Sequence, residues 1–505
     1  MSKNKTITYK LTNKVLLRTL AFVVIIFFTV SCKETSKAEK QSQESNLTKK
    51  DERPNIVLIL CDDLGYADVG FNGAKDILTP AIDTLANNGT IFTSAYVAHP
   101  FCGPSRAALM TGRYPHNIGS QYNLPRAHNN DQKGISIKEP FISKVLNKAG
   151  YYTGAIGKWH LGTVSKYHPN NRGFDHFFGF LGGGHNYFPE QFKVAYQKEK
   201  EKGNDKIWEY ITPLEENGAD IDETEYITDA LSREAQNFIN QASKKESPFF
   251  LYLSYNAPHT PLEAKDEDLE VYAHIENKNR RIYAAMVHAI DRGVGKLVSS
   301  LQKTGELENT LIVFLSDNGG RTDKGGMNTP LRGRKGNTLE GGIRVPMFFH
   351  WPKNVPKGKT YQHPVSALDF YPTFVKLAKA EMPKNKIIDG KDIWYDFIQG
   401  KKTRPEEPIF TLRHRTGSNE VGIRLNNWKA YKGERTPWKL YNIVNDIEEK
   451  NDLSEQHPEV LEQLVAKSNQ WAKTHIEPKW FHDKKTEENW STLNMPNFEE
   501  TFTVE

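Results

Sequence analysis

Cysteine is scarce in this sequence. Its 505 residues include three cysteines, Cys32, Cys61 and Cys102. So few thiols exclude a disulfide-dense scaffold, because such scaffolds are small chains held together by several bridges. If Cys32, near the N-terminus, is modified by a lipid, Cys61 and Cys102 either form a single disulfide bridge or remain two free thiols.

Long apolar runs are missing as well. Residues 20–30 are apolar apart from Thr29, but these eleven residues fall short of the ~20 that a membrane-spanning helix needs. Basic residues precede the run, as in a bacterial signal peptide. It ends at Val30-Ser31-Cys32, which resembles a lipobox. We therefore predict a lipoprotein signal peptide over residues 1–31 and a lipid anchor at Cys32; the alternative is an ordinary signal peptide with a chance cysteine.

This N-terminal pattern also predicts where the protein works. Residues 32–53 are polar and are expected to form a disordered tether. The protein would then be exported to the bacterial cell envelope, in the periplasm or at the outer membrane. It would contact the membrane only through the lipid anchor.

A strong charge of one sign is missing from the part that should fold. The whole chain has 67 basic and 62 acidic side chains, a net charge of +5. Residues 1–53 contribute 11 basic and 5 acidic side chains, which leaves 56 and 57, or −1, for the remainder. This balance gives no reason to expect a nucleic-acid partner. Any recognition of an anion must be local.

Several short apolar runs are continuous rather than alternating, which is typical of parallel strands covered on both faces. They lie at residues 56–60, 249–253, 311–315 and 345–350. Amphipathic helical stretches lie between or near them, at residues 79–88, 142–149, 228–242 and 280–304. This order predicts an α/β domain over residues 54–382, with a large, mostly parallel sheet flanked by helices.

A boundary is expected near residue 382, where a helix at 368–379 gives way to a stretch rich in Pro and Lys. Residues 383–505 then predict a smaller C-terminal α+β subdomain with an antiparallel sheet. Its strands are expected at residues 408–413, 422–424, 428–431 and 439–442, and its helix at residues 458–474. The last thirty residues show little periodicity and are expected to form an extended tail.

Polar side chains follow three of the predicted strands. Asp62 and Asp63 come after the first, His259 follows the second, and Asp317 and Asn318 follow the third. In open parallel sheets, ligands bind beyond the carboxyl ends of the strands. Oxygen ligands from Asp and Asn suit a hard cation such as calcium or magnesium. Each pair taken alone is also typical of a simple turn or helix cap.

Cys102 comes just before a predicted helix, because Pro104 is suited to the first helical position. A helix N-terminus favours anions, and Arg106 lies about one turn further on. The plain alternative is a reactive or buried thiol. Residues 102–113, CGPSRAALMTGR, match the pattern C-x-P-S-R-x-x-x-[LM]-T-G-R throughout.

This segment resembles the signature of the formylglycine-dependent (type I) sulfatases of the alkaline phosphatase superfamily. The resemblance extends over residues 54–455 and includes further segments in the family's order. These are residues 55–70 (NIVLILCDDLGYADVG), 157–160 (GKWH), 256–259 (NAPH), 316–319 (SDNG) and 335–346 (KGNTLEGGIRVP).

The resemblance implies a nucleophile and a metal site. A separate maturation enzyme would oxidise Cys102 to formylglycine, whose hydrated aldehyde attacks sulfur. One Ca2+ ion would be bound by Asp62, Asp63, Asp317 and Asn318 together with residue 102. Cys61, beside the first Asp pair, is interpreted as a packed thiol.

The resemblance also implies roles for cations and histidines. Arg106, Lys158 and Lys335 would contact the sulfate and residue 102. His259 would protonate the leaving alkoxide, and His160 would remove a proton to release sulfate. Glu340 and Arg344, in another shared segment, are interpreted as a structural ion pair.

Three residues are candidates for substrate binding. His185 lies in a glycine-rich loop, where related enzymes place substrate contacts, and Arg413 and His414 end a predicted strand of the C-terminal subdomain. The predicted substrate is a sulfated polysaccharide or its oligosaccharides, with an algal glycan such as ulvan preferred to a glycosaminoglycan. The alternatives are a phosphodiesterase or phosphonate monoester hydrolase of the same superfamily, and a non-catalytic glycan-binding lipoprotein.

Overall fold

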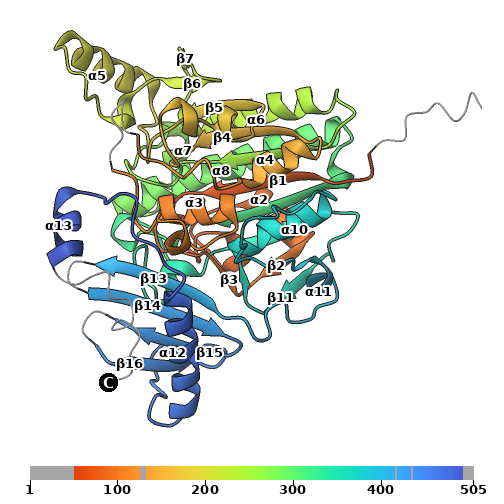
Figure 1. The fold of residues 1–505 in the computed structure, drawn as a ribbon. Helices are drawn as coiled ribbons and strands as arrows, with labels where there is room; N and C mark the ends of the chain where they lie inside the picture. The colour runs from red at the N-terminus through yellow and green to blue at the C-terminus, as the bar shows by residue number, and fades with distance from the viewer. Residues whose placement is uncertain (1–50, 126–131, 416–417, 434–435, 493–505) are drawn as a thin grey trace, which may run out of the picture. The chain divides into compact units, whose positions relative to one another are not determined.

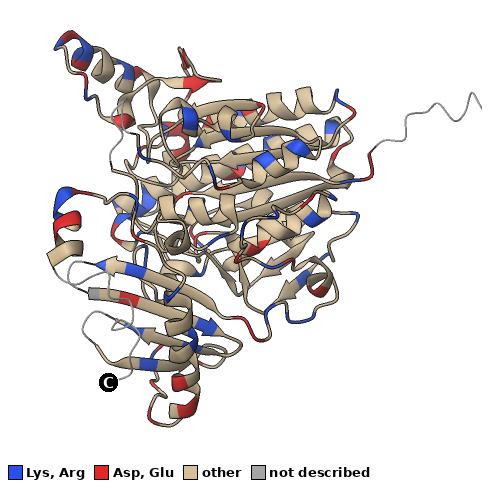
Figure 2. Ribbon diagram, in the orientation of Figure 1, with Lys and Arg blue, Asp and Glu red and all other residues tan. Residues whose placement is uncertain are grey.

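A computed structural model describes residues 51–125, 132–415, 418–433 and 436–492. The predicted signal peptide, the Cys32 anchor and nearly all of the tether lie outside the described residues. No helix within these ranges is long and apolar enough to cross a membrane. Lys and Arg are interspersed with Asp and Glu over the fold (Figure 2), as the near-zero charge of this part suggests.

Five neighbouring parallel strands form the centre of the main sheet (Figure 1). In sheet order they are β9 (Thr310–Ser316), β1 (Asn55–Cys61), β8 (Phe249–Ser254), β4 (Tyr152–Lys158) and β5 (His176–Phe180). Their residues are almost all buried, so continuous apolar runs are required. The mostly parallel sheet predicted from the sequence is confirmed.

The predicted parallel strand at residues 345–350 is wrong in its direction. It forms β10 (Met347–His350), which pairs with β9 in antiparallel orientation. To lie parallel to β9, β10 would have to start at the end of the sheet where β9 starts, which requires a crossover connection. The chain between the two strands forms only a short 3₁₀ turn and the four-residue α9 (Glu340–Ile343), and it re-enters the sheet at the end where β9 finishes.

Two sheet strands, β4 and β5, were missed because glycines interrupt their apolar pattern. Gly154 and Gly157 lie in β4, where close packing leaves no room for a side chain. A Cβ on Gly157 would lie 2.0 Å from the carbonyl oxygen of Ser254, and one on Gly154 would lie 2.4 Å from the Phe238 ring. The glycines therefore allow the neighbouring elements to approach closely.

Helices cover both faces of the sheet (Figure 1). Alternate residues of β1 enter two different cores: Ile56 and Leu58 pack with α3, α4 and α10, whereas Val57 and Ile59 pack with α2, α6 and α8. These helices span Cys102–Thr111 (α3), Ile142–Lys148 (α4), Phe370–Leu377 (α10), Pro80–Asn87 (α2), Ile227–Ala242 (α6) and Lys278–Lys303 (α8). Most of the expected helix bounds agree to within two residues.

The remaining elements lie at the edges of this layer. The sheet is extended on one side by β2 and β11 and on the other by β6 and β7. Their bounds are Thr90–Phe92 (β2), Lys359–Tyr361 (β11), Leu214–Glu216 (β6) and Ala219–Ile221 (β7). The pair β3 (Ala95–Tyr96) and β12 (Val365–Ser366) forms a separate small sheet, and further helices are α5 (Pro189–Glu201), α7 (Asp266–Val271) and α11 (Trp394–Ile398).

The C-terminal part contains the predicted antiparallel sheet of four strands. They are β13 (Ile409–Arg415), β14 (Ser418–Leu425), β15 (Trp428–Lys432) and β16 (Trp438–Asn442), and α12 (Pro458–Ala472) packs on them. The predicted extended tail is wrong over α13 (Lys484–Thr492). Asp483 accepts a hydrogen bond from the Thr486 amide (2.7 Å), and Trp490 is buried, so a capped helix forms there.

A buried ionic cluster joins this small sheet to the main domain. Lys429 of β15 lies 3.0 Å from Glu340 Oε1 and 2.8 Å from Glu449 Oε1, and all three side chains are fully buried. Arg344 lies 3.2 Å from Glu340 Oε2, which confirms the predicted structural ion pair. Glu340 therefore belongs to a network of four charged side chains, which is larger than the single ion pair predicted from the sequence.

Candidate active site

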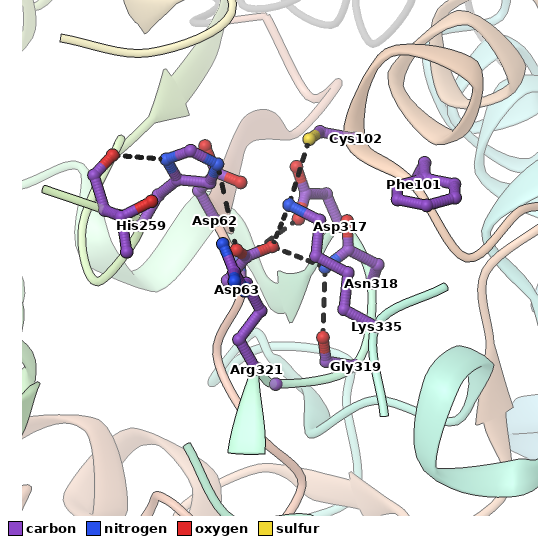
Figure 3. Close-up of polar contacts among 12 residues, drawn as sticks. Asp62, Asp63, Phe101, Cys102, His259, Asp317, Asn318, Gly319, Arg321 and Lys335 are labelled. Atoms are coloured by element: carbon purple, nitrogen blue, oxygen red, sulfur yellow. Dashed lines mark hydrogen bonds and ion pairs between the residues drawn. The ribbon is translucent and has the colours of Figure 1, made fainter. Parts of the chain in front are cut away.

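The carboxyl ends of β1 and β9 meet at one edge of the sheet. Cys61 and Ser316 are paired in register, so the residues that follow them converge. The Asp63 amide donates to Asp317 Oδ1 (3.3 Å), and Asn318 Nδ2 donates to Asp63 Oδ1 (2.7 Å). The structure thus brings together the acidic pairs that the sequence predicted to be neighbours (Figure 3).

This group of oxygen atoms fits a hard cation. Asp62 Oδ1 and Asn318 Oδ1 are buried and have no hydrogen-bond partner among the described residues. Potential ligand atoms of Asp62, Asp63, Cys102 and His259 all lie within 4.8 Å of one another. Buried carboxylate and amide oxygens without donors are costly unless a cation satisfies them. The donor set therefore matches Ca2+ rather than a soft metal.

Cys102 is the first residue of α3 and is buried at the edge of this cluster. Phe101 before it is extended, with φ −135° and ψ 149°, so the helix begins at the thiol itself. The Gly103 amide donates to Asn123 Oδ1 (2.9 Å). Burial raises the pKa of the Cys102 thiol, and the nearby lysines only partly oppose this effect. As a thiol, the residue is therefore a poor nucleophile.

Lys335 is the cation that faces Cys102. Its Nζ lies 3.4 Å from Cys102 Sγ and 2.6 Å from Asp63 Oδ1 (Figure 3). Burial alone would lower the pKa of Lys335, but the negative charge of Asp63 raises it above its usual range. Lys335 is thus a fixed positive charge at the point where the predicted nucleophile lies.

Arg106 and Lys158 lie behind the carboxylates. Arg106 is fully buried, and its Nε donates to Asp317 Oδ2 (2.9 Å), while Lys158 forms an ion pair with Asp62. Burial alone would raise the pKa of Asp62, but the charge of Lys158 lowers it well below its usual range. Lys158 therefore holds Asp62 ionised, whereas burial, together with the charge of Asp62, raises the pKa of Asp317 to about 7 against the opposing effect of Arg106.

The two predicted catalytic histidines lie on the cavity wall. His259 Nδ1 donates to the carbonyl oxygen of Thr260 (2.7 Å), so Nε2 is the nitrogen available to a substrate, 3.8 Å from Asp63 Oδ2. Burial lowers the pKa of His259 to about 4 and places that of His160 well below its usual value. Both rings are therefore neutral at pH 7 in the free protein.

A cavity of about 510 Å³ opens above these groups. Cys102, His160, His259 and Lys335 line it, together with residues that the sequence analysis missed. The missed residues include Trp208, Tyr210 and Arg321. Trp208 and Tyr210 stack with ring centroids 4.5 Å apart and planes at 13°. Two aromatic residues close together in a polar segment, Trp208 and Tyr210, are the signal that could have indicated this wall.

The three predicted substrate contacts have different positions. His185 is buried outside this cavity, and both of its ring nitrogens contact backbone carbonyl oxygens, of Asn186 (2.7 Å) and Thr212 (2.8 Å). This geometry gives His185 a structural role instead of the predicted substrate contact. Arg413 and His414 line a neighbouring cavity of about 350 Å³. Cys61 is buried and unbridged, as is Cys102, which excludes a disulfide between them.

Comparison with known proteins decides which family this arrangement represents. A family model described as "Sulfatase" matches residues 54–380, and one described as "N-sulphoglucosamine sulphohydrolase, C-terminal" matches residues 335–474. The chain belongs to the sulfatase family. This sulfatase is an enzyme that hydrolyses sulfate esters, and its fold is that of the alkaline-phosphatase-like superfamily.

Similar proteins include animal and bacterial sulfatases. Arylsulfatase J of Mus musculus is 31% identical over 489 residues, covering 87% of this chain and 79% of the relative. N-acetylgalactosamine-6-sulfatase of Mus musculus is 34% identical over 396 residues, covering 75% and 72%. The crystal structure of Ps i-CgsB in complex with k-i-k-neocarrahexaose is 57% identical, with a TM-score of 0.88, and covers 90% of this sulfatase and 100% of that chain.

Proposed function

We propose that this sulfatase removes sulfate from a carrageenan-type galactan or its oligosaccharides, through a nucleophile formed by oxidation of Cys102. The observation that carries the proposal is the meeting of Cys102, His259 and two carboxylates within 4.8 Å. A sulfate ester placed against residue 102 would face three groups at once. They are the imidazole of His259 as the acid, the ammonium group of Lys335, and the metal-binding carboxylates of Asp62 and Asp63. Hydrolysis of sulfate esters on sulfated glycans is already indicated by the family and its relatives.

The proposed metal is one Ca2+ ion, held by Asp62, Asp63, Asp317, Asn318 and residue 102. When bound, the ion would supply positive charge that neutralises the sulfate. Lys158 and Arg106 would hold the side chains of Asp62 and Asp317 in place from behind through their ion pairs. Lys335 adds a fixed positive charge beside residue 102.

In the proposed mechanism, two histidines carry out two separate proton transfers. A hydrated aldehyde at residue 102 would supply the attacking oxygen. His259 would donate a proton from Nε2 to the leaving sugar oxygen, because Nδ1 is held by the Thr260 carbonyl. The negative charge of a bound sulfate favours the protonated imidazole and so opposes the effect of burial. His160, on the same wall, would accept a proton during release of sulfate.

The carrageenan-type substrate is proposed from the relative that is 57% identical, whose crystal structure contains a neocarrahexaose. That relative favours carrageenan over ulvan, the example chosen from the sequence. The stacked Trp208 and Tyr210 offer an apolar platform beside the cavity, and sugar rings pack well on such surfaces.

We also propose export as a lipoprotein anchored at Cys32 in the cell envelope, with a separate maturation enzyme acting on Cys102. Both proposals rest on the sequence pattern. Incorporation of labelled lipid into the wild type but not into Cys32→Ala would support the anchor, and equal labelling of both would refute it.

The decisive test of the nucleophile is mass spectrometry of the peptide that contains Cys102, after expression with a maturation enzyme. We expect an aldehyde in place of the thiol, and loss of activity in Cys102→Ala. Full activity with an unmodified thiol would refute the mechanism. The substrate is tested with defined oligosaccharides of carrageenan, ulvan and glycosaminoglycan, beside an aryl phosphodiester. Faster cleavage of the diester would favour the alternative of a phosphodiesterase.

A further inference from the structure

A second cavity beside Cys102 is walled by arginines. We infer that Arg321, Arg334 and Arg413 bind a second sulfate group, carried by the sugar next to the one that is hydrolysed. The inference rests on the proposed function, since it concerns another part of the same substrate. It makes the enzyme selective for densely sulfated chains.

This arginine cavity has a volume of about 480 Å³. Arg321 and Lys335 line both this cavity and the one that contains Cys102, so the two are adjacent. Figure 3 shows Arg321, Lys335 and Phe101 around the Cys102 pocket. A chain whose reacting sulfate lies at residue 102 would therefore place a neighbouring sugar in the arginine cavity.

The charge of the arginine cavity is strongly positive. Four arginines, Arg321, Arg334, Arg413 and Arg415, line it with one carboxylate, that of Asp323. Arg415 is also paired with Glu420 (2.9 Å), which leaves a net charge of +2 without counting Lys335. Residues 54–505 as a whole carry a net charge of −1. A local excess of this size in a nearly neutral protein is a site for an anion.

Contacts on the walls hold the guanidinium groups in position. Arg413 lies over the Phe101 ring, 4.6 Å from its centroid, and also donates to the Gly336 carbonyl. Asp323 contacts both Arg321 (2.5 Å) and Arg334 (2.9 Å). Two arginines that share one carboxylate are not neutralised, and planar guanidinium groups suit the oxygen atoms of a sulfate.

Arg334 is the best residue to perturb. Its side chain is 49% exposed, and Asp323 is the one ion-pair partner found for it among the described residues. Two positions away, Arg332 is also exposed but donates to the Glu449 carbonyl (2.9 Å) and does not line the arginine cavity. Arg332→Gln is therefore a matched control that removes the same charge from the same loop.

The test uses two oligosaccharides that share the sulfate to be cleaved and differ in a second sulfate on the adjacent sugar. In Arg334→Gln, we expect KM for the doubly sulfated substrate to rise roughly threefold to tenfold, which allows for solvent screening of an exposed contact. KM for the singly sulfated substrate should change by less than about twofold. In Asp323→Asn, KM for the doubly sulfated substrate should fall, because a competing carboxylate is removed.

Opposite signs for these two variants, with Arg332→Gln unchanged, would support the second sulfate site. Equal KM values for both substrates in the wild type, or equal changes for both substrates in Arg334→Gln, would overturn it while the proposed function stands. Failure of the wild type to cleave either substrate, with cleavage of an aryl phosphodiester, would overturn the proposed function itself. Raising the salt concentration should weaken the preference for the doubly sulfated substrate.

Discussion

Replacement of His259 by Ala tests the proton transfer on which cleavage of a sugar sulfate depends. A sugar alkoxide is a poor leaving group and needs a proton in the transition state, whereas a nitrophenolate leaves readily without one. Loss of the imidazole should therefore slow the two reactions to very different extents.

The size of the effect follows from the geometry. Potential ligand atoms of Asp62, Asp63, Cys102 and His259 lie within 4.8 Å of one another, so an ester oxygen between residue 102 and the imidazole would lie about 3 Å from Nε2. A positioned general acid is worth roughly 10²–10⁴-fold in rate. We expect a loss of that size in kcat for a sugar sulfate and a loss below about tenfold for nitrophenyl sulfate.

The assay compares kcat for both substrates in wild type, His259→Ala and His274→Ala, an exposed histidine that does not line the Cys102 cavity. Circular dichroism and calcium affinity should show that the variants are folded and hold the metal. Equal losses on the two substrates would refute a role for His259 as the acid, since an effect on binding or on the metal would slow both.

Three further predictions concern the metal and stability. Added Ca2+ should raise the melting temperature of the wild type, because a ligand at one hundred times its dissociation constant adds about 2.7 kcal/mol to the free energy of unfolding. Asn318→Ala should need more Ca2+ for the same shift in melting temperature. Lys429→Met should lower the free energy of unfolding by roughly 3–5 kcal/mol in chemical denaturation, because two glutamates remain buried beside it, while Lys432→Met on the same strand should change little. Burial lowers the pKa of His414 from 6.5 to about 4, so the stability that it contributes is complete above pH 6.5 and is lost as the pH falls towards 4. That loss is at most about 3 kcal/mol, and His414→Asn should show a shallower fall in melting temperature over this range at constant Ca2+; parallel curves would contradict the assignment.

The position of the site could be predicted because strand ends are visible in the sequence. Continuous apolar runs identify strands that are buried on both faces, and Asp62 and Asp317 come directly after two of them. The carboxyl ends of parallel neighbours meet at one edge, so these side chains have to converge. The direction of β10 could not be predicted in the same way, since burial produces the same apolar run in either direction.

Other parts of the site depend on contacts that leave no periodic signal. Trp208, Tyr210 and Arg321 lie in irregular segments or short turns, where only the folded chain shows which cavity they line. The position of Arg106 behind the acidic cluster is also invisible in the signature that contains it, because the motif specifies a residue type and not the direction of its side chain. The structure places it against Asp317 and Ser254.

The buried cluster of Lys429, Glu340 and Glu449 limits how the C-terminal sheet of this enzyme can be exchanged or removed. Glu340 follows Lys335 by five positions and opens α9, so a loop that forms the cavity wall is attached through it to the small sheet. A hybrid that receives the C-terminal sheet of another sulfatase must also receive an ammonium group at this point. Without one, two carboxylates would be left in a dry interior, and the loop that carries Lys335 would lose its support. A truncated enzyme ending near residue 382 would lose Lys429 and Glu449 together, so Glu340 would keep Arg344 but the loop that carries Lys335 would no longer be attached to the small sheet.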